Sequence, residues 1–190
     1  ISMQTILDYT PDNLLAAALV ILFLYALKSM SIVFPIIVLE VAAGHIFPVI
    51  IAIIINIFGM IICLTVPYFV GYFSSSGAIN KMTQKYPILE KLIQKQSKNS
   101  FFACFFVRTL YFLPRDAVSM FFGAVKFSFG VYLLASALVS LPNVILATLF
   151  GTSITEPASP MFWISTSLMI LFAGVSLFIY NIFIKGKQQL

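Results

Sequence analysis

Long runs of apolar residues constrain this chain more than any other feature of its sequence. The longest cover residues 49–73, 127–151 and 161–184. A helix of roughly 20 residues crosses the hydrocarbon core of a bilayer, so each run is long enough to span it. With 61% hydrophobic residues, 9% charged residues and a mean hydropathy of +1.06, the composition excludes an ordinary water-soluble domain. The sequence therefore predicts one all-α polytopic membrane domain over residues 1–190.

Prolines and polar stretches divide this domain into seven predicted segments. Residues 29–47, interrupted by Pro35, and residues 101–125, interrupted by Pro114, are too short to cross twice and favour re-entrant hairpins. Residues 74–100 are rich in lysine and indicate an amphipathic segment at the membrane surface, with a solvated loop as the alternative. The remaining four segments are predicted transmembrane helices: 12–28, 48–73, 127–152 and 160–184.

The positions of the lysines predict the orientation of the chain. If both hairpins return to the side from which they enter, the five lysines of residues 74–100 share a side with three others: Lys126, Lys185 and Lys187. Lys28 is then alone on the opposite side, where it is expected to snorkel to an interface. The positive-inside rule therefore predicts that the lysine-rich segment and the C-terminus lie in the cytoplasm. The expected location is the plasma membrane or the bacterial inner membrane. The net charge of +5 then indicates anionic lipid rather than nucleic acid.

The two predicted hairpins share a spacing of proline and glycine. Pro35 lies nine residues before Gly44, and Pro114 lies nine residues before Gly123. The first hairpin would enter from outside and the second from inside, which is the arrangement of an inverted repeat. Broken helices of inverted repeats meet near the middle of the membrane in many secondary transporters. The predicted fold is therefore an inverted repeat of two re-entrant helical hairpins with about four transmembrane helices.

Four charged residues fall inside these hairpins: Glu40, Arg108, Arg115 and Asp116. A charge at the bilayer centre costs at least ~2.5–3.5 kcal/mol, so these side chains should face one another or water. Pro114 suits the start of a helix, which places Arg115 and Asp116 in the first helical turn. Free N–H groups there, with Arg108 and Arg115, favour an anion and above all a phosphate. The alternative is a set of buried ion pairs that only holds the hairpins together.

Other polar residues give weaker signals. Glu40 is expected either to pair with an arginine or to bind a proton, because burial favours the neutral form of a carboxylate. His45, the single histidine, is expected as an interfacial cap rather than a ligand, and Cys63 and Cys104 as small buried residues. No hydrolase, nucleotide-binding or metalloprotease motif occurs, so the sequence predicts neither an enzyme nor a cofactor or metal site.

The stretch 105–123 resembles the signature of a known family. Its residues are Phe105, Arg108, Pro114, Arg115, Ser119 and Gly123, and the pattern is similar to that of the DedA family, also called the VTT domain or SNARE-associated Golgi protein family. The first hairpin adds a similar element, namely Pro35, Glu40, Ala42, Ala43 and Gly44, so that the resemblance covers roughly residues 30–152. Val107 stands where common bacterial members have glycine, which places the chain closer to the branch of the Golgi and vacuole membrane proteins.

The resemblance implies a membrane lipid transporter, a flippase or scramblase with two facing hairpins. Bacterial members move undecaprenyl phosphate or phosphatidylethanolamine, often with the proton-motive force. The essential acid of the family maps to Glu40, and its arginines map to Arg108 and Arg115. Together with Asp116 these form the expected substrate site, and the residues expected to shape the hairpins are Pro35, Gly44, Pro114, Ser119 and Gly123.

The leading hypothesis is therefore transport of a phosphate-bearing lipid, either a phospholipid or a polyprenyl phosphate, between leaflets. One alternative is a proton-coupled carrier of a small solute or cation that uses Glu40. A further alternative is a non-transporting membrane scaffold that binds partners or anionic lipid through residues 74–100. The expected partners are the phosphate head groups of membrane lipids, with protons as a second partner, and an oligomer is compatible with the sequence.

Overall fold

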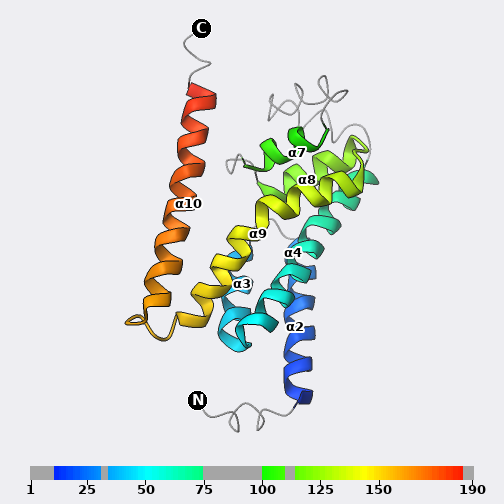
Figure 1. Cartoon of the computed structure of the whole chain (residues 1–190). Coiled ribbons are helices and arrows are strands. Elements are labelled where there is room, and N and C mark those ends of the chain that lie inside the picture. Colours follow the sequence, from blue (N-terminus) through cyan, green and yellow to red (C-terminus); the bar gives the residue numbers. More distant parts are fainter. Residues whose placement is uncertain (1–10, 31–33, 75–99, 110–113, 186–190) are drawn as a thin grey trace.

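A computed structural model describes residues 11–30, 34–74, 100–109 and 114–185. Within these ranges the chain is helical and contains no strand, as the sequence predicts. Most of the predicted lysine-rich segment, and Lys187 at the C-terminus, lie outside the described residues. The helices, labelled in Figure 1, are α2 (Pro11–Ser29), α3 (Ile36–Ile46), α4 (Val49–Tyr72), α7 (Ser100–Thr109), α8 (Arg115–Ala124), α9 (Phe129–Ser153) and α10 (Pro160–Lys185).

Two long helices, α4 and α9, form the frame of the molecule. They contain 24 and 25 residues with mean hydropathies of 2.9 and 2.0, so that both are long and apolar enough to cross a membrane. Each contains a proline, Pro67 in α4 and Pro142 in α9, without ending there. Among the described residues, these are the two helices that meet both criteria of length and composition.

Shorter helices lie against this frame from opposite ends. In Figure 1, α2 and α3 occupy the lower part of the molecule, and α7 and α8 occupy the upper part. The side chain of Tyr25, near the end of α2, lies against Gly59, and the Cys63 thiol donates to the Tyr25 carbonyl oxygen at 3.4 Å. Since both residues are in the middle of α4, α2 ends beside the middle of that helix. Pro35 and Pro114 directly precede α3 and α8, and Arg115 and Asp116 occupy the first turn of α8 as predicted.

The position of Lys28 differs from the prediction. The sequence places this residue at an interface, yet only 8% of its surface is exposed and its ammonium lies 2.7 Å from the carboxylate of Asp116. The prediction that Lys28 snorkels is wrong because α2 ends inside the protein, next to the first turn of α8. Snorkelling requires a helix end near the membrane surface.

Glycines allow the short helices to approach the long ones closely. Gly44 of α3 faces Gly151 of α9, and Gly123 of α8 faces Gly71 of α4. A Cβ atom added at any of the four would overlap a main-chain carbonyl oxygen of the facing helix. Close backbone approach through small residues is typical of helix contacts in membranes, where the hydrophobic effect does not drive association. Gly44 therefore lies within α3, where this helix crosses α9.

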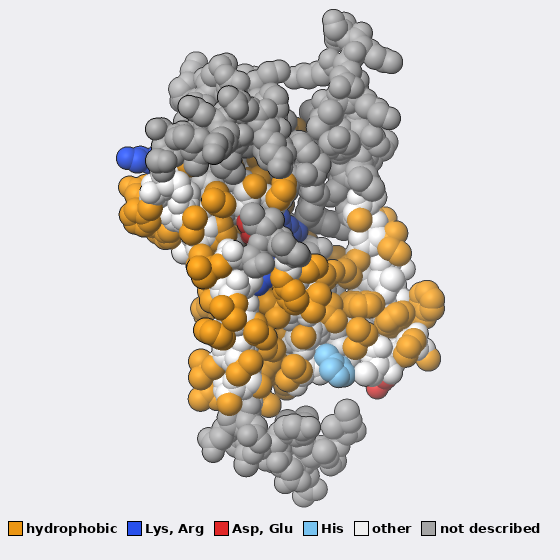
Figure 2. All heavy atoms as spheres, turned by 180° about the vertical axis from the view of Figure 1, so that it is seen from behind, with side chains coloured by type: hydrophobic (Ala, Val, Ile, Leu, Met, Phe, Trp, Pro, Cys, Tyr) orange, Lys and Arg blue, Asp and Glu red, His pale blue; other side chains and the backbone are white. Residues whose placement is uncertain are grey.

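Hydrophobic side chains also cover the exterior. On the face drawn in Figure 2 they form most of the described surface. Ile50, Phe58 and Leu19 are examples of large residues that are more than half exposed. A contiguous apolar exterior of this extent marks a surface that contacts lipid or another protein. The described part of the chain thus combines an apolar exterior with charged groups in its interior.

The glycine contacts predict the effect of a single methyl group. Gly123→Ala should destabilise the protein by about 1–3 kcal/mol or more, because the added atom meets the backbone of α4 and neither helix can move away freely. Thermal unfolding of the detergent-solubilised protein measures this change.

The matched control is Gly174→Ala in α10, where an added Cβ has no atom within 4 Å. This substitution should be neutral or raise the stability by roughly 0.5–1 kcal/mol, because alanine favours a helix more than glycine does. Equal effects of the two substitutions would contradict the close packing of α8 on α4.

Candidate functional site

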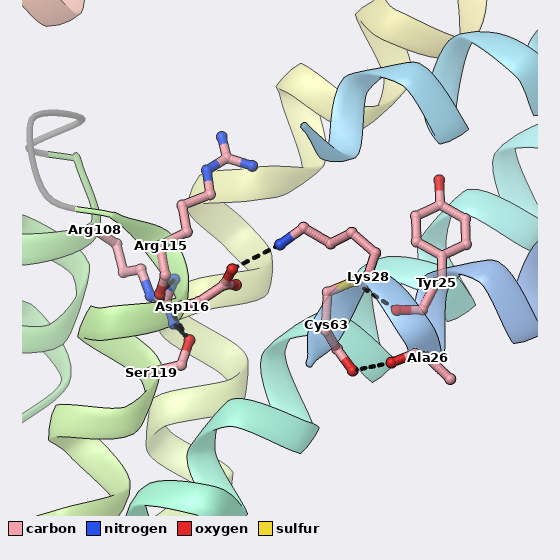
Figure 3. A network of polar contacts seen from close by, with 9 residues as sticks. Tyr25, Ala26, Lys28, Cys63, Arg108, Arg115, Asp116 and Ser119 are labelled. Carbon is pink, nitrogen blue, oxygen red and sulfur yellow. Dashed lines mark hydrogen bonds and ion pairs between the residues drawn. The ribbon is translucent and has the colours of Figure 1, made fainter. Parts of the chain in front are cut away.

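The charged residues of the interior surround a small cavity between the helices. Its volume is about 30 Å³. One water molecule needs roughly 10–15 Å³ by this measure, so the cavity has room for water but not for a lipid head group. Figure 3 shows residues around it, which come from α2, α4, α7 and α8. The lining residues are Lys28, Ile36, Met60, Cys63, Leu64, Arg108, Arg115, Asp116 and Ser140.

An ion pair joins two of these helices. Lys28, at the end of α2, donates a hydrogen bond of 2.7 Å to Oδ2 of Asp116 in the first turn of α8. Each charge suits its position, because a cation is favourable at the C-terminal end of a helix and an anion at the N-terminal end. The side chains of Lys28 and Asp116 are only 8% and 10% exposed. Removal of one partner would therefore leave an uncompensated buried charge.

Arg108 of α7 is held by uncharged groups. Its Nη2 donates to the hydroxyl oxygens of Ser119 at 2.6 Å and Tyr132 at 2.7 Å, and its Nη1 donates to the carbonyl oxygen of Arg115 at 3.2 Å. The hydroxyl hydrogens are used elsewhere, since Ser119 donates to the Arg115 carbonyl and Tyr132 donates to that of Leu64. Both hydroxyl oxygens are thus fixed as acceptors that position the guanidinium.

The charge of Arg108 is not balanced by these contacts. Among the described residues no carboxylate lies within 4 Å of its guanidinium, and its buried Nε has no hydrogen-bond partner there. The side chain is only 7% exposed. A buried arginine held by neutral acceptors, with a donor remaining beside a cavity, is suited to bind an anion.

Arg115 and Glu40 come from different helices, α8 and α3. Arg115 is half-buried and extends from α8 in a different direction from Asp116, as Figure 3 shows. It lines the cavity and interacts electrostatically with Glu40 of α3. The structure thus brings the acid of the first hairpin near an arginine of the second.

Glu40 is completely buried, with an exposed fraction of 0%. Neither oxygen of its carboxylate has a hydrogen-bond partner among the described residues. Tyr25 of α2 and Cys63 of α4 are close enough to interact with it electrostatically. A buried carboxylate without hydrogen bonds is costly when ionised, so Glu40 depends on a nearby cation for compensation.

A second polar cluster fixes the helix that carries Glu40. The amide nitrogen of Asn56 donates to the main-chain oxygen of Glu40 at 2.9 Å and to the Thr148 hydroxyl at 2.8 Å. Its amide oxygen accepts a bond of 2.7 Å from the Tyr25 hydroxyl. Asn56 therefore connects α2, α3, α4 and α9 at the middle of the molecule. The sequence signal for it was a single amide within the apolar run of residues 49–73.

The structure thus assembles the residues that the sequence selected and adds others. Arg108, Arg115 and Asp116 line one cavity, Ser119 orients Arg108, and Glu40 lies nearby. Lys28, Tyr132, Asn56 and Tyr25 are additions to the predicted set. With three cationic side chains and one carboxylate around it, the cavity carries a surplus of positive charge that favours an anionic ligand.

The described residues do not form a metal site. No group of three potential ligands from histidine, cysteine, aspartate or glutamate occurs in the described part of the chain. His45 is exposed in the last turn of α3, and Cys63 and Cys104 are buried free thiols.

Comparison with known proteins identifies the family of this site. Residues 34–153, which include both short proline-capped helices and both long helices, match the VTT domain. Comparisons with curated proteins and with solved structures give no match. Proteins with this domain are membrane proteins, are often proposed as transporters or flippases and are generally not enzymes. Since the match covers more than half of the sequence, the chain belongs to the VTT domain family, that of DedA and the SNARE-associated Golgi proteins.

Proposed function

We propose that this protein moves a phosphate-bearing lipid between the two leaflets of a membrane. The phosphate would bind Arg108 and Arg115 beside the first turn of α8, while the acyl or prenyl chains remain in the lipid around the protein. Asp116 and Glu40 would balance the positive charge when the site is empty. Membership of a family that is often proposed to transport lipids supports this function.

The state of Arg108 is the observation that carries this proposal. Its side chain is buried, its bonds are to neutral oxygens, and its Nε has no partner in the described part of the chain. A guanidinium matches the geometry of a phosphate, to which it donates two parallel hydrogen bonds. The nearby start of α8 adds partial positive charge and free N–H groups.

We further propose that the fold is an inverted repeat, in which α2, α3 and α4 correspond to α7, α8 and α9. Two observations support this correspondence. Pro35 and Pro114 precede α3 and α8, and each short helix packs on the long helix of the other unit through a glycine pair. In this arrangement α2 with α3, and α7 with α8, would form two re-entrant hairpins whose charged tips meet through Lys28 and Asp116. Helix α2 would then be an arm of the first hairpin, rather than the transmembrane helix expected over residues 12–28.

The proposed membrane is the plasma membrane or bacterial inner membrane, with the lysine-rich segment and the C-terminus in the cytoplasm. The count of eight lysines on that side supports this orientation. The substitution of Val107 for a family glycine supports placement near the branch of the Golgi and vacuole membrane proteins. Phospholipids and polyprenyl phosphates share the phosphate that the site would bind, so both are proposed substrates.

Substitution of Arg108 tests this function. Arg108→Gln should lower the rate at which liposomes containing the protein move fluorescent phospholipid or polyprenyl phosphate by about tenfold or more, because a charge-assisted hydrogen bond contributes roughly 1.5–3 kcal/mol. Arg108→Lys keeps the charge and should retain part of the rate. Dithionite quenching of the outer-leaflet fluorophore measures the movement.

Lys126→Gln is the matched control, because Lys126 is an exposed cation outside the cavity. Its rate should equal that of the unchanged protein. Thermal unfolding and insertion into the liposomes are compared for all variants, so that loss of folding is separated from loss of transport. Wild-type movement of both lipids by folded Arg108→Gln protein would contradict the proposed function.

The environment of Glu40 favours a second candidate, a proton-coupled carrier of a small solute or cation. The observation is the buried carboxylate without a hydrogen-bond partner among the described residues, with Tyr25, Cys63 and Arg115 around it. Such a group changes charge when a nearby cation approaches or leaves, which couples a proton to a movement.

Glu40→Gln distinguishes proton coupling from uncoupled lipid movement. The substitution keeps the shape of the side chain and removes its proton binding, so any transport that depends on a pH gradient should become independent of the gradient or cease. Transport is measured in liposomes with and without an imposed gradient. Glu156→Gln, in the exposed link between α9 and α10, is the control and should keep the wild-type gradient dependence. Equal gradient dependence in both variants would exclude Glu40 as the coupling group.

A further inference from the structure

A second and larger space lies beside the charged cavity. Its volume is about 250 Å³, and it forms a groove between α2 and α3. The residues that line it are Leu24, Leu27, Lys28, Phe34 and Leu39. Four of these five are apolar, and Leu24, Leu27 and Phe34 are exposed on the exterior. The groove therefore opens to the surroundings of the protein and has one charged group on its wall.

Lys28 belongs to both spaces. It lines the groove together with the apolar residues, and it lines the charged cavity together with Arg108 and Arg115. Its methylene chain contributes apolar surface, while its ammonium pairs with Asp116 on the cavity side. The molecule thus places an apolar groove and a cationic cavity next to each other with one side chain between them.

This juxtaposition matches the two parts of an amphipathic molecule. We propose that the groove between α2 and α3 binds one hydrocarbon chain of a phosphate-bearing lipid, and that Lys28 at its inner end binds the phosphate in exchange for Asp116. The inference rests on the proposed function, to which it adds a site for the chain and a further residue for the head group. A neutral lipid with the same chains has no anionic group that could replace the Asp116 carboxylate as the partner of Lys28.

The exchange is balanced in charge. Lys28 is buried beside a single carboxylate at 2.7 Å, so a phosphate can replace that partner without leaving the ammonium unpaired. Asp116 remains in the first turn of α8, where helix N–H groups stabilise a carboxylate. It also lines the cavity together with Arg108 and Arg115, whose positive charges would compensate it once Lys28 pairs with the phosphate. The head group would thus pass from Lys28 to the two arginines over a short path.

Photolabelling of the full-length protein tests this inference without a transport measurement. The probes are a phosphatidic acid and a diacylglycerol with identical chains that carry a diazirine near the chain end. The protein is kept in dodecyl maltoside micelles, which contain no phosphate. Labels are located by mass spectrometry of peptides. The peptides of α2 and α3 should carry about tenfold more label from phosphatidic acid than from diacylglycerol, because one charge-assisted contact distinguishes the two.

Two sets of variants assign the label to Lys28 and to the groove. Lys28→Met combined with Asp116→Asn removes both charges together, which avoids an unpaired buried ion, and should lower phosphatidic acid labelling to the level of diacylglycerol. Lys28→Arg should keep the preference. Leu27→Trp fills the groove and should lower labelling by both probes, whereas Leu19→Trp, on an exposed position of α2 that does not line the groove, should not.

Equal labelling by the two probes in the unchanged protein would overturn the inference, since the groove would then be ordinary lipid-facing surface. Labelling that Leu27→Trp leaves unchanged would overturn it as well. These failures differ from failure of the proposed function. If Arg108 variants lose transport while the probes label α2 and α3 equally, only the inference fails. If labelling follows the expectation while folded Arg108 variants transport normally, only the role of Arg108 in transport fails.

Discussion

The ion pair between Lys28 and Asp116 is the interaction on which the interior of this protein depends. A single charge in an apolar interior is costly, and each residue of the pair offsets the cost of burying the other. The pair also joins two helices, and its two residues are 88 positions apart in the sequence. It therefore fixes the end of α2 against the start of α8, and the cavity with Arg108 and Arg115 forms around this contact.

Close packing of the helices fixes the distances between the polar groups of the site. Four glycines allow close contact between helix backbones: Gly44, Gly71, Gly123 and Gly151. Helix α3 is therefore held in a fixed position on α9, and α8 on α4. This packing holds Glu40 of α3, and Arg115 and Asp116 at the start of α8, in place. The hydroxyls of Ser119 and Tyr132 add direction, since each donates to a backbone carbonyl and accepts from Arg108. Apolar packing thus sets the distances, and hydrogen bonds set the orientation of the guanidinium.

Local chemistry made part of this site predictable from sequence. Pro114 favours a helix start because its ring fixes φ and leaves it without an N–H group, and this places Arg115 and Asp116 in the first turn of α8. Apolar run length in the same way predicts α4 and α9. The role of Lys28 was not predictable, because a lysine at the end of an apolar helix has the same sequence pattern at an interface and inside a bundle. Only the contact of α2 with the middle of α4 decides between them.

The size of the cavity constrains how the proposed transport can proceed. At about 30 Å³ it is too small for a lipid phosphate, so binding requires the surrounding helices to separate. The Lys28–Asp116 contact joins α2 to α8 beside the cavity, and its separation would expose one cation and one anion. A phosphate would pair with Lys28 and leave Asp116 beside Arg108 and Arg115, whereas a neutral lipid would leave Lys28 unpaired at a cost of several kcal/mol. In the proposed transport, the position of this ion pair between an apolar groove and a cationic cavity would make opening of the site depend on the charge of the molecule that enters.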